Sequence, residues 1–257
     1  MKKILIRLSL ALIILVILGV LAVGLFLDGA VKRGVETIGP KVANVDIKLN
    51  AVSLSLLSGS GKISGLVVGN PEGFKTPSAI KVDNATLALK PGSILGDKVV
   101  IHTIHLQGPE ITFETDLKGN NLSKILANVQ AATGGSGETT PAQSEAAKSG
   151  KKLQVDDFVI SGAKLHVSVT ALGGQAATVP LPEIHLKELG TGPDGITPAE
   201  LTKKVLQAIE KEAIQASSST VAALGKDAAN LVKGAGKTAG ETAEKVTKGI
   251  GDLFKKK

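Results

Sequence analysis

The chain has 257 residues, with no cysteine, tryptophan or tyrosine, one methionine and five phenylalanines. Without cysteine it forms neither disulfides nor thiolate metal sites, and so few aromatic rings argue against a nucleic-acid partner, because single strands are bound by stacking on such rings. The net charge of +7 lies at the two ends. Residues 1–27 hold three basic and no acidic residues, residues 221–257 hold eight lysines and four acids, and residues 28–220 hold nineteen of each sign. Basic ends on a neutral body favour a membrane surface over DNA.

The first predicted element is a membrane anchor. Residues 8–27 are twenty consecutive uncharged residues, which as a helix would span about 30 Å, the thickness of the hydrocarbon core of a bilayer. Lys2, Lys3 and Arg7 precede this run, so the positive-inside rule places the N-terminus in the cytoplasm and the bulk of the chain outside it. A cleaved signal peptide is the alternative, but the run is longer than the usual apolar region and its end lacks an Ala-x-Ala site. The residues assigned to the anchor are Leu8, Leu10, Ile13, Leu15, Ile17, Leu21, Leu25 and Leu27.

Nine segments after the anchor predict β-strands. Residues 28–43 first predict a short helix that stops at Gly39-Pro40, a breaker pair. Apolar residues then alternate with polar ones from Val45, and the alternation slips by one residue after Leu49, which predicts a bulge or bend. Because turns separate successive strands, we expect antiparallel pairing and one apolar face that something must cover. The other predicted strands are 62–68, 80–90, 99–106, 110–114, 153–160, 164–170, 177–181 and 183–189.

Helical patterns interrupt and follow these strands. Residues 120–130 predict a short helix, and residues 131–152 have the low-complexity composition of a linker or disordered loop. Thr197-Pro198-Ala199-Glu200 is a capping box with proline at the first helical position. The predicted units are an anchor (1–27), a helical connector (28–43), a sheet with a following helix (44–130), a linker (131–152), strands completing the sheet (153–195) and an amphipathic helical region (196–257).

The last part of the chain repeats apolar residues every eleven positions. Eleven residues make about three α-helical turns, so these side chains form one stripe along a long helix. Two interpretations stay open. The stripe lies on a membrane surface with its lysines over anionic headgroups, or it packs on the sheet or on another helix. The residues of this stripe are Val221, Leu224, Val232, Val246, Ile250, Leu253 and Phe254.

The polar motifs do not assemble a catalytic site. The SGSGK sequence at Ser58–Lys62 resembles part of a phosphate-binding loop, but it lacks the first glycine and the hydroxyl residue after the lysine. His102 and His105 are three apart in a strand and so point to opposite faces, and the adjacent Asp156 and Asp157 do the same. We therefore expect no metal site, no cofactor and no enzymatic activity, with a hydrolase as the disfavoured option.

The run GLVVGNPEGF ends at a turn that looks at first like an active-site loop. Asn70, Pro71 and Gly73 suit the first, second and fourth positions of a type I β-turn. Glu72 would then lie in solvent, and Phe74 would pin the loop onto the apolar face. This pattern predicts a structural corner.

Several short motifs follow the anchor in order: TIGPKV (37–42), VSLSLLSGSG (52–61), GLVVGNPEGF (65–74), PGSIL (91–95), VIHTIHLQGPEITFE (100–114) and NLSKIL (121–126). This succession resembles the AsmA-like family of bacterial envelope proteins over residues 4–127 and more loosely over 153–210. The resemblance implies an inner-membrane protein whose periplasmic part is a curved β-sheet with a hydrophobic groove, along which large members carry phospholipid. About nine strands at ~4.8 Å spacing extend roughly 40 Å. That is too short to bridge a periplasm, so we expect lipid contact in a short groove.

Together these features predict an α+β protein with an N-terminal transmembrane helix, a curved and mainly antiparallel AsmA-like sheet, and a long C-terminal amphipathic helix. The expected function is non-enzymatic envelope maintenance or lipid handling at the bacterial inner membrane. The alternative is an envelope scaffold whose C-terminal helix binds another protein or a membrane surface. The expected partners are the membrane, through a single span, phospholipid and envelope proteins. The sequence leaves open whether the apolar face is an open groove or is covered by the C-terminal helix.

Overall fold

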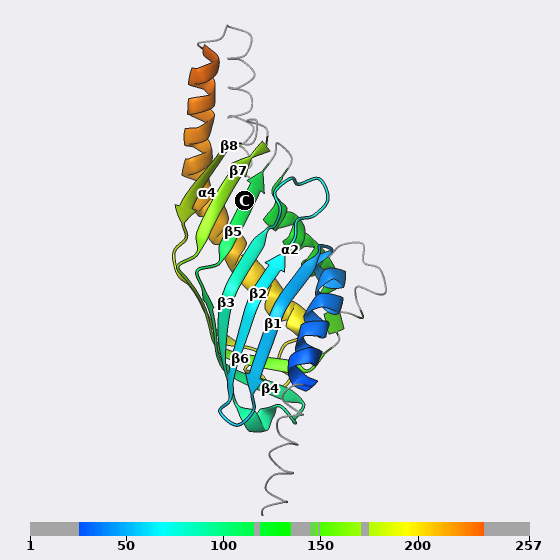
Figure 1. Ribbon diagram of the computed structural model, residues 1–257. Helices are drawn as coiled ribbons and strands as arrows, with labels where there is room; N and C mark the ends of the chain where they lie inside the picture. The colour runs from blue at the N-terminus through cyan, green and yellow to red at the C-terminus, as the bar shows by residue number, and fades with distance from the viewer. Residues whose placement is uncertain are drawn as a thin grey trace, which may run out of the picture.

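The computed structural model describes residues 26–115, 119–134, 145, 147–148, 150–170 and 175–233, and for Gln175, Ser219 and residues 221–233 it describes the backbone alone. Within these residues the chain forms a curved, mixed nine-stranded sheet with helices packed on it (Figure 1). This confirms the predicted α+β class. The predicted anchor lies outside the described residues apart from Phe26 and Leu27. Among the residues that are described, no helix is long and apolar enough to cross a membrane.

All nine predicted strands are present near their expected positions. The strands are β1 (Ile47–Ser55), β2 (Ser60–Val68), β3 (Ile80–Leu89), β4 (Lys98–Gln107), β5 (Glu110–Thr115), β6 (Lys152–Ser161), β7 (Lys164–Val169), β8 (Gln175–Pro180) and β9 (Ile184–Leu189). The helices are an N-terminal helix at residues 26–43, a short 3-10 helix η1 (Pro91–Ser93), α2 (Asn121–Ala132) and α4 (Pro198–Lys233).

The pairing of the strands differs from the antiparallel expectation in two places. β1, β2 and β3 form an antiparallel meander, and the far side of β3 pairs with both β4 and β5. β4 and β5 then pair in parallel with β6 and β7, at one constant register from Lys98↔Lys152 to Thr115↔Val169. The reason is the long connection between β5 and β6, which contains α2. It returns the chain to the end of the sheet where β4 begins, so that β6 runs in the same direction as β4. Parallel strands need a crossover of this length.

A line of one-residue insertions crosses the whole sheet, and we call it the first crease. On β1, Leu49 is 2 % exposed, Asn50 and Ala51 point outward, and Val52 and Leu54 return to the inner face. This confirms the slip predicted for β1. The same slip occurs at the same level across the sheet, within β2 and β3 and between consecutive strands farther on, because the strand registers place the inserted positions opposite one another. They are Asn50, Gly65, Asp83, Gly108, Gly162 and Pro182.

Glycines make the first crease possible. Gly65, Gly108 and Gly162 have φ angles of +64°, +58° and +64°, a left-handed conformation that L side chains avoid. An inserted residue bends a strand and increases its twist. Because the insertions are aligned, the sheet curves as one body and the apolar residues stay on the same face on both sides of the crease.

Helices cover part of this apolar face. Leu206, Ile209 and Ala213 of α4 are buried, and α4 packs on β7, β8, β9 and α2. α2 presents its own buried face, including Ile125 and Val129, to β5 and α4. α4 begins at the predicted capping box: the N–H of Glu200 donates to Thr197 Oγ1 at 3.1 Å, and the N–H of Thr197 donates to Glu200 Oε2 at 2.7 Å.

The N-terminal helix covers the edge of the sheet beside β1. Asp28, Lys32 and Glu36 are spaced by four residues and therefore share one helix face. They bond the backbone of β1: the N–H of Leu54 donates to Asp28, Lys32 donates to the carbonyl of Leu49, and the N–H of Leu49 donates to Glu36. These contacts occupy backbone groups that would otherwise offer a template for another strand.

The end of this helix lies later than predicted. The helix passes Gly39-Pro40 and ends at residue 43, where Asn44 takes a φ of +53° and its N–H donates to the carbonyl of Pro40 at 2.9 Å. Pro40 has no N–H to donate to the carbonyl four residues earlier, so the helix continues past it with one backbone hydrogen bond fewer. Gly39 serves packing, since a Cβ there would come within 2.9 Å of Ile47 Cδ1.

Candidate functional site

The inner face of the sheet is apolar along complete cross-strand rows, but it is not covered evenly. Under α2 and α4, Ile111, Phe113, Leu165 and Val167 are at most 1 % exposed. On the other side of the first crease, where β1 ends and β2 begins, several apolar side chains on the inner face of β1–β4 stay half-buried. We call four of these the apolar strip: Leu54, Ile63, Leu87 and Leu106.

The apolar strip is continuous across β2 because of a glycine. A Cβ at Gly61 would lie 2.7 Å from Leu54 Cδ2 and 3.2 Å from Leu87 Cδ1, so the side chains of β1 and β3 meet over the bare backbone between them. α4 therefore covers the apolar face at the β7–β9 side, and the apolar strip on β1–β4 lies beside that cover. The apolar face is thus covered by α4 over β7–β9 and only partly covered at the apolar strip.

The GNPEGF loop is a structural corner, but its turn is displaced by one residue from the prediction. The N–H of Phe74 donates to the carbonyl of Pro71 at 3.3 Å, and Gly73 has a φ of +98°. The turn is therefore Pro71–Phe74, with glycine at the third position, where a positive φ is required. Asn70 is drawn out of the turn because its amide bonds Thr76 and Asn121.

Phe74 also differs from the expectation that it packs on the apolar face. It lines a shallow hollow of about 280 Å³ together with Asp46, Lys48 and Val67, which point to the outer face of β1 and β2. Glu72 is exposed. Sequence patterning could not place Phe74, because a loop has no alternation to say which face it returns to.

A buried carboxylate that the sequence did not single out holds this loop. Glu114 is 1 % exposed. It accepts from the N–H of Lys75 at 2.8 Å, the N–H of Thr76 at 2.8 Å, the hydroxyl of Thr76 at 2.6 Å and the hydroxyl of Thr170 at 3.1 Å. Burial would raise the pKa of the Glu114 carboxyl, but the hydrogen bonds from Thr76, Lys75 and Thr170 outweigh burial, so its pKa lies below the ordinary value. These donors occupy both oxygens, which favours a structural role.

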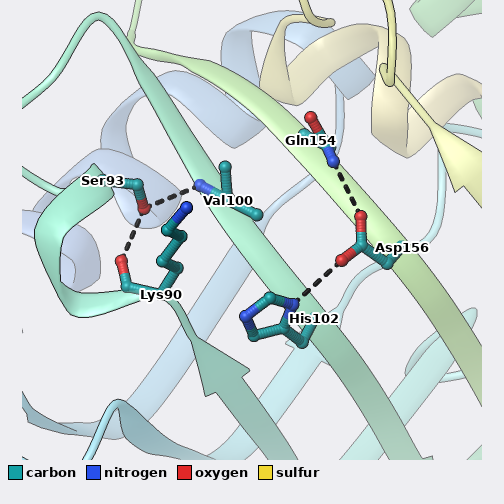
Figure 2. A network of polar contacts seen from close by, with 6 residues as sticks. All are labelled: Lys90, Ser93, Val100, His102, Gln154 and Asp156. Carbon is teal, nitrogen blue, oxygen red and sulfur yellow. Dashed lines mark hydrogen bonds and ion pairs between the residues drawn. The ribbon is translucent and has the colours of Figure 1, made fainter.

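His102 and the paired aspartates lie at a second crease. His102 is an extra residue in β4, between the pairs Leu89↔Ile101 and Ala88↔Thr103. Asp156 on β6 lies beside it, and Glu188 on β9 has a φ of +56°. His102 Nδ1 lies 2.9 Å from Asp156 Oδ2, and Gln154 donates to Asp156 Oδ1 at 2.8 Å (Figure 2).

These contacts explain the electrostatics of the second crease. Hydrogen bonds from Gln154 and His102 lower the pKa of the Asp156 carboxyl. The adjacent Asp157 bonds His185 on β9 instead. Ile101, Ile104, Val155 and Phe158 are all buried on the inner face, so the extra residue in β4 and β6 places His102 with His105, and Asp156 with Asp157, on the outer face. The prediction that each pair points to opposite faces is therefore wrong. Within the described part of the chain, no three His, Cys, Asp or Glu side chains are grouped to hold a metal ion.

The C-terminal stripe is reached only in part. Val221, Leu224 and Val232 lie within α4, of which the backbone is described there, and Val246, Ile250, Leu253 and Phe254 lie outside the described residues. In Figure 1 the orange end of α4 runs on past β8 and away from the sheet. The amphipathic role of the stripe stays a prediction.

Comparison with known families decides the relationship. The AsmA family model matches residues 1–244. The chain belongs to the AsmA family. The match runs from the predicted anchor through the sheet into the C-terminal helical region, beyond residue 210, where the resemblance was expected to end. Membership of the AsmA family relates this protein to the bacterial cell envelope. Neither a curated protein nor a solved structure matches the sequence.

Proposed function

We propose that this AsmA-family protein is a single-pass, inner-membrane-anchored protein that handles envelope phospholipid in the periplasm without catalysing a reaction. In this proposal an acyl chain lies along the apolar strip. The observation that carries the proposal is the half-buried state of Leu54, Ile63, Leu87 and Leu106 on a face whose other half is sealed by α2 and α4.

The dimensions of the apolar strip suit such a ligand. It crosses four strands, about 14 Å at the usual spacing, and each methylene removed from water there contributes about 0.8 kcal/mol. The polar clusters described above do not suggest a competing role. Glu114, Asp156 and Asp157 are occupied by the sheet and its loops, and this supports a non-enzymatic function.

A pair of adjacent positions on β3 gives a direct test. A photocrosslinking amino acid at Leu87 faces the apolar strip, and the same amino acid at the exposed Thr86 faces the opposite side of the strand. We expect phospholipid adducts from intact cells at Leu87 and few at Thr86. Equal labelling at the two positions, or none at Leu87, would overturn the proposal.

A second function, an envelope scaffold, is favoured by one observation. α4 continues to Lys233, past the strands that it covers (Figure 1), and so presents helix to another molecule. Deleting residues 221–257 separates the two functions. Loss of a protein complex with unchanged lipid adducts at Leu87 would identify a scaffold, and loss of the lipid adducts alone would argue against one.

A further inference from the structure

Three large apolar side chains are exposed at one end of the molecule, which we call the basal end. Phe26 at the start of the N-terminal helix is 74 % exposed, Leu57 at the tip of the β1–β2 hairpin is 83 % exposed, and Leu95 after η1 is 90 % exposed. Exposed leucines scattered singly need no explanation. Three at one end do, because a grouped apolar surface marks an interaction site.

The hydrogen bonds show that these three segments lie together. The N–H of Leu54, three residues before Leu57, donates to Asp28 at 2.7 Å, which brings the hairpin to the start of the N-terminal helix. The N–H of Leu89 donates to the carbonyl of Gly59 at 2.5 Å, and a Cβ at Gly59 would lie 3.1 Å from the Pro91 ring. The hairpin therefore also touches η1, as Figure 1 shows at the bottom of the view.

The loop that carries Leu95 is fixed. Ser93 Oγ donates to the carbonyl of Lys90 at 2.6 Å and accepts from the N–H of Val100 at 2.9 Å (Figure 2). From the other side, Lys151 Nζ donates to the carbonyls of Ile94 at 2.5 Å and Gly96 at 3.0 Å. The fold thus holds the Leu95 side chain outward on a braced loop, although exposing an apolar side chain to water is unfavourable.

Basic side chains surround this loop. Lys90, Lys98, Lys151 and Lys152 lie within or beside the segments that brace it. The acidic groups among them are the exposed Asp97 and Asp194, and Glu200 lies near Lys152. Apolar tips with lysines just behind them are the composition of surfaces that lie in the headgroup region of an anionic bilayer.

The neighbouring sequence identifies the occupant. The uncharged run of residues 8–27 leads directly into the N-terminal helix, whose first described residue, Phe26, is at the basal end. A bilayer containing that run would lie against this end. We propose that the basal end docks on the surface of the membrane, with Leu57 and Leu95 inserted among the lipids and the lysines at anionic headgroups. The proposal rests on the membrane anchoring proposed above and adds a second, independent contact.

Docking would fix the direction of the sheet. β2 would rise from the bilayer over about 30 Å, given nine residues at the usual strand rise. Leu54, the first member of the apolar strip, would stand three residues from the inserted Leu57. The apolar strip would then start at the lipid surface, where an acyl chain enters without crossing water.

The composition of the chain makes a clean test possible. It has no tryptophan or tyrosine, so a single introduced tryptophan is the only indole. We would place the full chain in vesicles of phosphatidylethanolamine and phosphatidylglycerol as Leu57→Trp, Leu95→Trp and, as a matched control, Glu72→Trp. Glu72 is exposed in the loop after β2, at the opposite end of that strand.

Bromine atoms on the acyl chains quench an indole that reaches them. We expect brominated lipid to remove more than about half of the emission at Leu57→Trp and Leu95→Trp, since interfacial insertion reaches ~5–10 Å, with unchanged emission at Glu72→Trp. Vesicle-bound protein that shows equal quenching at all three positions, or none, would refute docking while leaving the lipid adducts at Leu87 as a separate measurement. Protein that fails to float with the vesicles would refute anchoring and docking together.

Discussion

Replacing Glu114 by glutamine tests how the loop after β2 is held. The substitution preserves size but removes the charge, and it turns one acceptor oxygen into an NH₂ group that faces donors. The two backbone N–H groups of Lys75 and Thr76 both point at this carboxylate, and one of the two oxygens receives both Thr76 groups. At least one donor that points at this buried carboxylate therefore loses its acceptor.

The size of the effect follows from those contacts. Leaving a buried donor unsatisfied costs about 1–3 kcal/mol, and the remaining bonds lose the extra strength that a charged acceptor gives. We expect Glu114→Gln to lower the free energy of unfolding by about 2–4 kcal/mol. Glu110→Gln is the matched control, because Glu110 lies on the same strand but is exposed, and we expect it to cost less than about 0.5 kcal/mol.

Urea titrations of the detergent-solubilised protein measure both variants, and hydrogen exchange reports on the amides of Lys75 and Thr76. The lowered pKa of Glu114 sets the pH dependence. The unfolded carboxyl titrates near ~4.3, so its stabilisation is complete above that pH and is lost as pH falls through the lower folded pKa. The difference between wild type and Glu114→Gln should therefore shrink in acid. A loss equal to that of Glu110→Gln, or a difference that grows below about pH 4, would refute the reasoning.

Three further predictions concern the frame of the sheet. Gly162→Ala should lower the free energy of unfolding by about 1–2 kcal/mol from its positive φ alone. Gly65→Ala should lower it more, because its Cβ would also lie 2.7 Å from Asn50 Cβ. Thermal unfolding that ranks the two variants the other way would contradict the account of the first crease. Glu36→Ala should speed hydrogen exchange at the Leu49 amide, whose acceptor it removes, and unchanged protection there would show that the helix does not seal the edge. Thr197→Ala should lower stability by about 1 kcal/mol through loss of the cap, measured by urea unfolding, and a neutral result would mean that α4 is held by packing alone.

Alternation of apolar residues determined much of the fold in advance. The positions of the strands, the slip after Leu49 and the start of α4 at Thr197 were all predictable, because each depends on residues within one or two turns or pleats of one another. The ordered motifs of residues 37–126 pointed to the family that the match over residues 1–244 then established. The one-residue slips beside Gly65, Gly108 and Gly162 that make the first crease are also present in the sequence. They can be recognised as one aligned feature only when the register of the neighbouring strands is known.

Tertiary structure alone decided which strands became neighbours. The parallel pairing of β4–β5 with β6–β7 depends on the path of the chain through α2, which no local pattern specifies. The partners of buried polar groups depend on it as well: Glu114 meets Lys75 and Thr76 across nearly forty positions of sequence, and His102 meets Asp156 across fifty-four. The periodicity of apolar residues shows which face of a strand or helix a side chain lies on, because that depends only on the local repeat of the backbone. It carries no information on what that face meets, since contact is made by segments that fold together from far apart in the chain.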